Sequence, residues 1–304
     1  MMYCDLLVKM CHDAENLDEQ QIKLARFLIQ KLFPIVPLQR SAISHSNVPF
    51  QRLVINETVV KTNSRLKSLS NLRYPPLEIE KELPYNRASL AGQSIFYCGS
   101  RGRLQVAVET LPKRGQLITE SSWIVKPDSQ LIVLALYQDR EIALYNPNEL
   151  MADYNNYLNL LSKLKTNARK VIEEIYKLIF LAFRRKVFPE NRKGYLISSL
   201  ISDFWLHHSS CEIDGIYYPS VPNNCSVMNL AVKPKVVDSK LQMIEAKEAI
   251  VLNDPSYSRG WMLQRTGTCS VYDENTNDLK WKNAPIPEGN EVYKVMKEFK
   301  INID

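Results

Sequence analysis

The sequence predicts an α+β protein, and three observations lead to that class. Segments with helical spacing of apolar residues and short runs of β-type residues both occur along the 304-residue chain. The two kinds of segment do not alternate regularly, as they would in a doubly wound parallel sheet. The sequence also lacks the G-x-G-x-x-G turn of dinucleotide-binding Rossmann folds. An α+β arrangement is therefore favoured over a Rossmann arrangement.

Four helices are predicted from apolar residues that recur every three or four positions. The first follows Asn16, which has the capping-box spacing to Glu19, and stops before Pro34. The third follows a stripe of seven apolar residues and is expected to be one long helix. The predicted helices cover residues 17–32, 104–111, 161–182 and 197–208.

Strands are predicted where apolar and β-branched residues form short runs between turn residues. The run 131–136 is apolar throughout and is expected to be a central strand of the sheet. The proline-containing passage 71–84 is expected to be mostly loop. The predicted strands cover residues 50–60, 95–98, 131–136, 216–221, 243–252 and 270–281, the last with a polar turn between Tyr272 and Leu279.

The chain is expected to have a three-part organisation. Residues 1–48 contain one predicted helix and a connector rich in proline and polar residues, and they are expected to be a helical accessory segment. Residues 49–235 have the size of an ordinary domain and are expected to carry the activity. Residues 236–304 are expected to be a β-rich extension packed on that domain.

The composition excludes some classes of protein and indicates the charge of a suitable ligand. With 45% hydrophobic and 24% charged residues, the chain is typical of globular proteins and not of disordered tails or fibrous repeats. The net charge of +6 follows from 39 basic and 33 acidic residues. This excess is too small to require nucleic acid as a partner, and it suits an anionic small molecule.

Cysteine use and hydropathy predict a cytoplasmic location. The six cysteines form no C-x-x-C pair, and the N-terminus does not have the pattern of a secretory signal. We therefore expect reduced thiols. The longest apolar run, residues 178–183, has six residues, whereas a membrane helix requires roughly 20. A soluble protein with no membrane contact is expected.

Three short segments stand out as a set. In the first, Arg87 is followed by Gly92 five residues later and by Tyr97 ten residues later. In the second, Glu109 closes the sequence Val-Ala-Val-Glu. The third, Gly-Ile-Tyr-Tyr-Pro-Ser, covers residues 215–220. In this order the segments resemble the RES family, named for its arginine, glutamate and serine. The resemblance covers roughly residues 50–232, and one departure is Ser89, where family members often carry asparagine.

The resemblance implies a fold similar to ADP-ribosyltransferases, with mixed or antiparallel sheets flanked by helices. It implies an enzyme that consumes NAD as a substrate by cleaving the bond between nicotinamide and ribose, with water or phosphate as acceptor. RES proteins act as toxins that deplete cellular NAD, and an antitoxin commonly restrains them. Transfer of ADP-ribose to a protein target is the alternative reaction. An antitoxin or another regulatory protein is thus an expected partner, and an oligomer is compatible with the sequence.

The chemistry gives each residue of this set a role. Nicotinamide leaves as a neutral molecule, so the barrier is a developing oxocarbenium ion, which an ionised Glu109 near the ribose would stabilise. Arg87 offers a fork of donors for a pyrophosphate or a ribose hydroxyl. Tyr97 can stack on the nicotinamide ring, and Ser220 can donate to ribose or phosphate oxygens. Arg52 lies where the family often shows an early arginine, and the resemblance makes it a second candidate phosphate ligand. Catalytic roles are thus expected for Glu109, Arg87 and Ser220, and cofactor-binding roles for Arg87, Tyr97, Ser220 and Arg52.

Two further patterns suggest other functions. His207, His208, Cys211 and Cys225 include metal-binding residue types, but their spacing matches no familiar zinc framework, and no metal is expected. Residues 163–193 contain ten basic and three acidic side chains. Such an excess suits a binding protein that engages an acidic partner without catalysis, although a solvated helix face is the commoner explanation.

Overall fold

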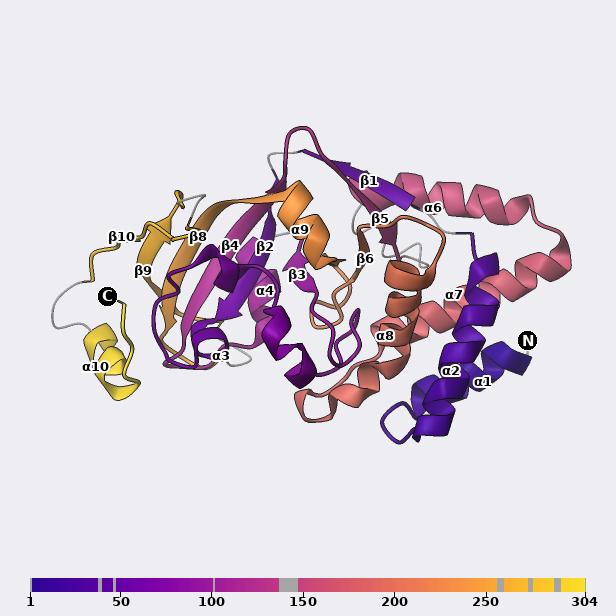
Figure 1. Ribbon diagram of the computed structural model, residues 1–304, viewed down its shortest axis with the longest axis horizontal. Coiled ribbons are helices and arrows are strands. Elements are labelled where there is room, and N and C mark those ends of the chain that lie inside the picture. The colour runs from indigo at the N-terminus through magenta and orange to yellow at the C-terminus, as the bar shows by residue number, and fades with distance from the viewer. Residues whose placement is uncertain are drawn as a thin grey trace. The chain divides into compact units, whose positions relative to one another are not determined.

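The computed structural model describes residues 2–37, 40–45, 48–100, 102–136, 147–255, 260–272, 276–286 and 291–303. Within these residues the protein has an α+β fold, as predicted, with nine α-helices and ten strands (Figure 1). The chain divides into two compact units, each built from three separate stretches of sequence. Unit 1 comprises Met1–Ser44, Leu77–Ile95 and Gln130–Val236, and unit 2 comprises His45–Pro76, Phe96–Ser129 and Val237–Asp304. The expected three-part organisation has other bounds and stays a prediction.

Unit 1 is rich in helices. Its α-helices are α1 (Met2–His12), α2 (Glu19–Leu32), α6 (Pro147–Ser162), α7 (Thr166–Arg184) and α8 (Leu196–Asp203). Helix α8 continues into one turn of π-helix, η5 (Phe204–His208), and short 3-10 turns occur at η1 (Phe33–Ile35), η3 (Leu77–Glu82) and η4 (Pro189–Tyr195). Helices α1, α2, α7 and α8 pack on one another (Figure 1). Helix α7 also contacts a strand of the same unit.

Two details of the predicted helices are corrected. The capping box of α2 is formed by Asp18 and Gln21, each accepting from the other's backbone N–H at 2.8 Å, and not by Asn16 and Glu19. The predicted long helix 161–182 is two helices, because Lys165 leaves the helical conformation with ψ at 145°. The apolar spacing continues across this break, so spacing alone does not reveal it. Within α7 the predicted stripe is buried from Ile172 to Ala182, whereas Ala168 near the start of the helix is exposed.

The strands of unit 1 follow the order β1–β5–β6–β7. They are β1 (Arg40–Ser44), β5 (Gln130–Ala135), β6 (Gly215–Pro219) and β7 (Met228–Val232). Strands β5 and β6 pair in parallel, and the other two pairs are antiparallel. Strand β5 has a partner on both sides, which confirms the predicted central strand. Strand β1 lies in the stretch expected to be a connector. Gly215 is required for the close β6–β7 approach, because a Cβ there would lie 2.4 Å from the Ala231 carbonyl oxygen.

Unit 2 contains a run of antiparallel strands in the order β3–β2–β4–β8–β9–β10. They are β2 (Phe50–Ile55), β3 (Phe96–Gly99), β4 (Leu117–Val125), β8 (Leu241–Val251), β9 (Leu263–Cys269) and β10 (Lys282–Asn283). Its α-helices are α3 (Asn56–Val60), α4 (Gly102–Thr110) and α10 (Glu291–Glu298), with a 3-10 turn at η2 (Leu69–Leu72). Helix α9 (Pro234–Lys240) lies where the chain passes from unit 1 to unit 2. Helix α10 buries Val292 and Val295 against Leu117 and Ile250.

Three predictions of strands or loops need correction. The predicted strand 50–60 ends at Ile55, where the Thr58 hydroxyl donates to the Ile55 carbonyl and the chain turns into α3. In the stretch 270–281 the described residues form isolated bridges instead of continuous strands: Tyr272 pairs with Leu279, on either side of the predicted turn, and Asp278 pairs with Ser68. The stretch 71–84, expected to be loop, contains 3-10 turns.

Candidate functional site

Arg52 lies on β2, where three elements of unit 2 meet. Strand β3 pairs with β2 through Gln51 and Gly99, and helix α4 packs on both strands. The Arg52 Nη1 atom donates to the Tyr97 carbonyl oxygen at 2.9 Å. Its guanidinium carbon lies 5.2 Å from the centre of the Phe96 ring, an attractive cation–π geometry. Two of the predicted site residues, Arg52 and Tyr97, are therefore in direct contact.

The guanidinium of Arg52 is incompletely compensated. Its Nε atom is shielded from solvent and has no hydrogen-bond acceptor, and among the described residues no carboxylate pairs with this side chain. Burial lowers the pKa of Arg52 to about 10, and the neighbouring Cys98 acts in the opposite direction. Arg52 as a whole is half-buried, but a donor atom shielded from water without an acceptor is costly. An anionic group brought to this position would offset that cost.

Tyr97 is half-buried on β3, between the buried Phe96 and Cys98. Phe96 packs edge-on against Trp123 with ring centres 5.2 Å apart, which fixes the strand against β4. Burial raises the pKa of the Cys98 thiol well above its usual range, so this cysteine stays protonated. The alternation along β3 therefore places the side chain of Tyr97 where it is partly open to solvent.

Glu109 lies in the last turn of α4 and is exposed to solvent. The helix ends two residues later at Leu111, which adopts a left-handed conformation with φ at 51° and donates its N–H to the Ala107 carbonyl at 2.8 Å. A leucine in this conformation costs roughly 1–2 kcal/mol. The strained end fixes where α4 stops and hence where Glu109 is presented.

Arg87 belongs to unit 1 and is 8% exposed. Its Nη1 atom donates to the carbonyl oxygens of Phe183 at 2.6 Å and Arg185 at 3.0 Å. The last carbonyls of an α-helix have no partner within the helix, so Arg87 satisfies the C-terminal end of α7. Its guanidinium also lies over the Tyr195 ring, 4.8 Å from the ring centre. These contacts give Arg87 a structural role.

The loop around Arg87 is fastened to α8 through Gln93 and Asp203, two residues that the sequence analysis missed. Gly92, in the left-handed conformation with φ at 80°, donates its N–H to the Leu83 carbonyl. The next residue, Gln93, donates from its side-chain amide to Asp203 at 2.6 Å. The buried Asp203 carboxylate also accepts from Arg26 at 2.9 Å and lies 3.4 Å from His208. No local pattern signals this contact, because Gln93 and Asp203 are 110 residues apart in sequence.

Ser220 follows β6 and is completely buried. Its hydroxyl accepts a hydrogen bond from the Asn223 side chain at 2.7 Å, and its carbonyl accepts from the Cys225 N–H at 2.8 Å. Asn224 and Cys225 both adopt the left-handed conformation. Ser220 therefore organises a tight turn between β6 and β7.

The five predicted residues are thus divided between the two units. Arg52, Tyr97 and Glu109 lie on neighbouring elements of unit 2, and Arg87 and Ser220 lie in unit 1. That all five form one site stays a prediction.

The residues of the candidate metal pattern, His207, His208, Cys211 and Cys225, all lie within the described part of the chain. The described part of the chain has no group of three or more histidine, cysteine, aspartate or glutamate side chains that could hold a metal ion. His207, His208, Cys211 and Cys225 are thus not gathered into such a group. In the same residues no helix is both long and apolar enough to span a membrane. All six cysteines are free thiols.

No protein-family model, curated protein or solved structure matches this chain in the comparisons made.

Proposed function

We propose that this protein is an NAD-consuming enzyme of the RES type, which cleaves the bond between nicotinamide and ribose and acts as a toxin that depletes NAD. One observation carries the proposal beyond the motif resemblance. Arg52 is a half-buried cation with a shielded, unpartnered Nε donor and without an ion pair to a described residue, and it contacts the Tyr97 carbonyl. The pyrophosphate of NAD supplies the missing negative charge, and Tyr97 supplies an aromatic surface for a nucleotide ring.

Glu109 is the carboxylate of the proposed reaction. When the bond between C1′ and nicotinamide breaks, the electron pair leaves with nicotinamide and positive charge develops on the ribose. The Glu109 carboxylate stabilises that charge and accepts a hydrogen bond from a ribose hydroxyl. The oxygen of water or phosphate then bonds to C1′ and loses its proton to solvent. The exposed position of Glu109 at the end of α4 is compatible with access by a substrate.

Arg87 and Ser220 have supporting roles in this proposal. Arg87 holds the end of α7 and Ser220 holds the turn after β6. Substitution of either residue would disturb local structure as well as any contact with NAD. Arg52 and Glu109 are therefore the better residues for testing the activity.

A non-catalytic binding protein that uses the basic segment 163–193 is the main alternative. Several of its charges are already compensated within unit 1. Arg169 pairs with Glu173 at 2.8 Å and Lys177 with Glu174 at 2.6 Å. Lys193 donates to the Leu17 carbonyl at 2.6 Å. These contacts favour the view that the segment is largely a solvated helix face. Transfer of ADP-ribose to a protein would use the same proposed site, with a protein side chain as acceptor.

Incubation of the purified protein with NAD tests the proposal. Nicotinamide and the ADP-ribose products are separated by chromatography after reactions with and without phosphate. Release of nicotinamide is expected, and the product formed with phosphate distinguishes phosphorolysis from hydrolysis. An absence of nicotinamide release under both conditions, together with co-purification of an acidic partner, would favour the binding protein instead.

Glu109→Gln should lower turnover by a factor of about 100 or more, because one electrostatic stabiliser of the transition state is lost. The variant should fold normally, since the side chain is exposed and the change is nearly isosteric. Glu291→Gln is a matched control, because Glu291 is an exposed glutamate in the first turn of α10. Nicotinamide release by the two variants is compared at saturating NAD. Equal rates would refute the role assigned to Glu109.

A further inference from the structure

Unit 1 contains a pocket that none of the five predicted site residues lines. It has a volume of about 540 Å³ and lies where α2, η1, β1 and η5 meet. This volume is within the range of small-molecule sites, roughly 300–1,000 Å³. The lining residues are Gln30, Phe33, Pro34, Val36, Arg40, Phe204, Trp205, His208, Ser209, Ser210 and Cys211.

The middle of the pocket is aromatic. Phe33 lies 6.2 Å from Phe204 and 5.3 Å from Trp205, measured between ring centres. Phe204 and Trp205 belong to the π-helical turn η5. Such turns are rare and frequently occur at functional sites, because they displace side chains from the regular helical positions. A flat apolar group would pack well against these rings.

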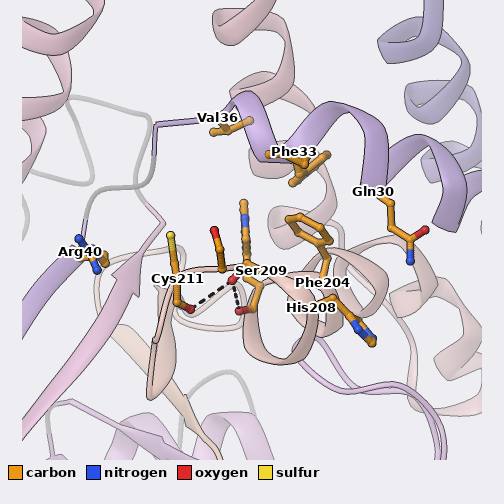
Figure 2. Close-up of a pocket in the computed structure, with 11 residues that line it drawn as sticks. Gln30, Phe33, Val36, Arg40, Phe204, His208, Ser209 and Cys211 are labelled. Carbon is orange, nitrogen blue, oxygen red and sulfur yellow. Dashed lines mark hydrogen bonds between the residues drawn. The ribbon is translucent and has the colours of Figure 1, made fainter.

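The polar groups of the pocket lie apart from one another. In the view of Figure 2, Arg40 and Cys211 lie to one side of Phe33 and Phe204, and Gln30 and His208 lie to the other. Arg40 is exposed, and no hydrogen bond or ion pair joins its guanidinium to a described residue. No acidic residue is among the described residues that line the pocket. Its charge therefore favours an anionic ligand.

Trp205 provides an independent indication of a missing partner. Its side chain is 1% exposed, and its indole Nε1 has no acceptor within the described part of the chain. A buried donor without an acceptor is rare in folded proteins and costs free energy. A ligand with an acceptor group held against the indole would remove that cost.

We propose that this pocket binds a small aromatic anion, with its ring against the cluster formed by Phe33, Phe204 and Trp205 and its negative group at Arg40. The site is independent of the proposed NAD chemistry, which involves other residues. His208 at one end of the pocket is also 3.4 Å from Asp203, which holds Gln93 in the loop of Arg87. A ligand that contacts His208 would thus act on a residue connected to that loop.

Cys211 makes binding measurable at the site itself. It lines the pocket and is half-buried, whereas the other five cysteines are buried. Burial also raises the pKa of Cys11 to about 11, which suppresses its reactivity. N-ethylmaleimide should therefore alkylate Cys211 first, and the added mass can be followed on the intact protein and assigned by peptide mapping.

The test uses 2-naphthoate as the anionic probe and 2-naphthamide as its neutral counterpart. We expect 2-naphthoate to bind saturably in calorimetry and to slow alkylation of Cys211, and 2-naphthamide to bind about tenfold more weakly because it lacks the charge. Arg40→Gln should abolish the preference for the anion. Arg169→Gln, on the exposed face of α7, should leave it unchanged.

Three results would overturn the proposal: no binding of 2-naphthoate up to its solubility limit, binding without protection of Cys211, or an anion preference that survives Arg40→Gln. A Ser210→Trp variant provides a second test that does not depend on charge. Ser210 is exposed and lines the pocket, so a large side chain there can occupy the pocket without disturbing the core. This variant should lose binding of both probes, and unchanged binding would place them elsewhere.

Discussion

Arg65 and Arg52, both in unit 2, have guanidinium groups that are compensated to different extents. The guanidinium of Arg65 donates to Glu248 at 3.0 and 2.8 Å and to Asn283 at 2.6 Å. It also lies over the Trp281 ring, 5.3 Å from the ring centre. Arg52 has one carbonyl acceptor and the Phe96 ring, and no carboxylate pairs with it among the described residues.

The difference separates a structural arginine from a candidate binding arginine. A buried charge that is fully paired holds the fold together, and removal of its partner leaves an uncompensated ion. A buried charge that lacks a counterion retains the capacity to bind one. Arg65 therefore should matter mainly for stability, and Arg52 mainly for binding of the proposed anionic substrate.

The largest effect on stability is expected from Arg65→Met. It leaves Glu248, which is completely buried, without its counterion, and should lower the free energy of unfolding by about 3–5 kcal/mol. Chemical denaturation followed by circular dichroism measures the change. The double variant Arg65→Met with Glu248→Leu removes both charges and should be more stable than the single variant. A double variant at least as unstable as Arg65→Met would show that the contacts of Arg65 are not centred on Glu248.

Arg52→Gln should have a small effect on stability and a large effect on substrate binding. It removes one hydrogen bond to a carbonyl and should change the free energy of unfolding by about 1 kcal/mol or less. If Arg52 binds the pyrophosphate, the KM for NAD should rise about tenfold or more, because a charge-assisted hydrogen bond is lost. Steady-state nicotinamide release measures KM, with Arg265→Gln, an exposed arginine on β9, as the control. A large loss of stability with unchanged KM would make Arg52 a second structural arginine.

The sequence predicted those parts of the fold that depend on local spacing. An apolar stripe identifies α7 and α8, and it becomes the buried face of α7, whereas every residue of α8 is buried. The apolar run of β5 likewise indicates a strand with neighbours on both sides. The break at Lys165 escaped prediction because the apolar spacing continues through it. The short helices α9 and α10 escaped because two or three turns contain too few apolar positions to show a period.

Long-range contacts around the candidate site could not be predicted. The contact between Arg52 and Tyr97 depends on the pairing of β2 with β3. The contact between Gln93 and Asp203 depends on how α8 packs in unit 1. The sequence did single out Arg87 and Gly92, and Gly92 does adopt the left-handed conformation that favours glycine. It did not show that Arg87 caps the end of a helix 96 to 98 residues later in the chain, because the acceptors are backbone carbonyls that carry no residue-specific signal.

The smallest effect on stability is expected near Arg73, a third arginine of unit 2. Its carboxylate partner, Asp238, is at the surface. Arg73 lies 3.4 Å from Asp238, and the Tyr74 hydroxyl donates to the same carboxylate at 2.7 Å. Burial and this hydrogen bond raise the pKa of Tyr74 to about 12 from its ordinary value of 10. Between these two pH values the unfolded phenol loses its proton while the folded one keeps it, so stability should fall as pH rises through this window.

Tyr74→Phe tests the direction of this pH dependence of stability. At pH 8 the variant should be less stable than the wild type by about 1 kcal/mol or less, because one partly exposed hydrogen bond is lost. The difference should shrink as the pH rises from 10 to 12, since phenylalanine has no proton to lose. Thermal unfolding at a series of pH values measures both curves. A difference that stays constant across this range would mean that Asp238 does not hold the Tyr74 proton, and that the Arg73–Asp238 pair is separate from it.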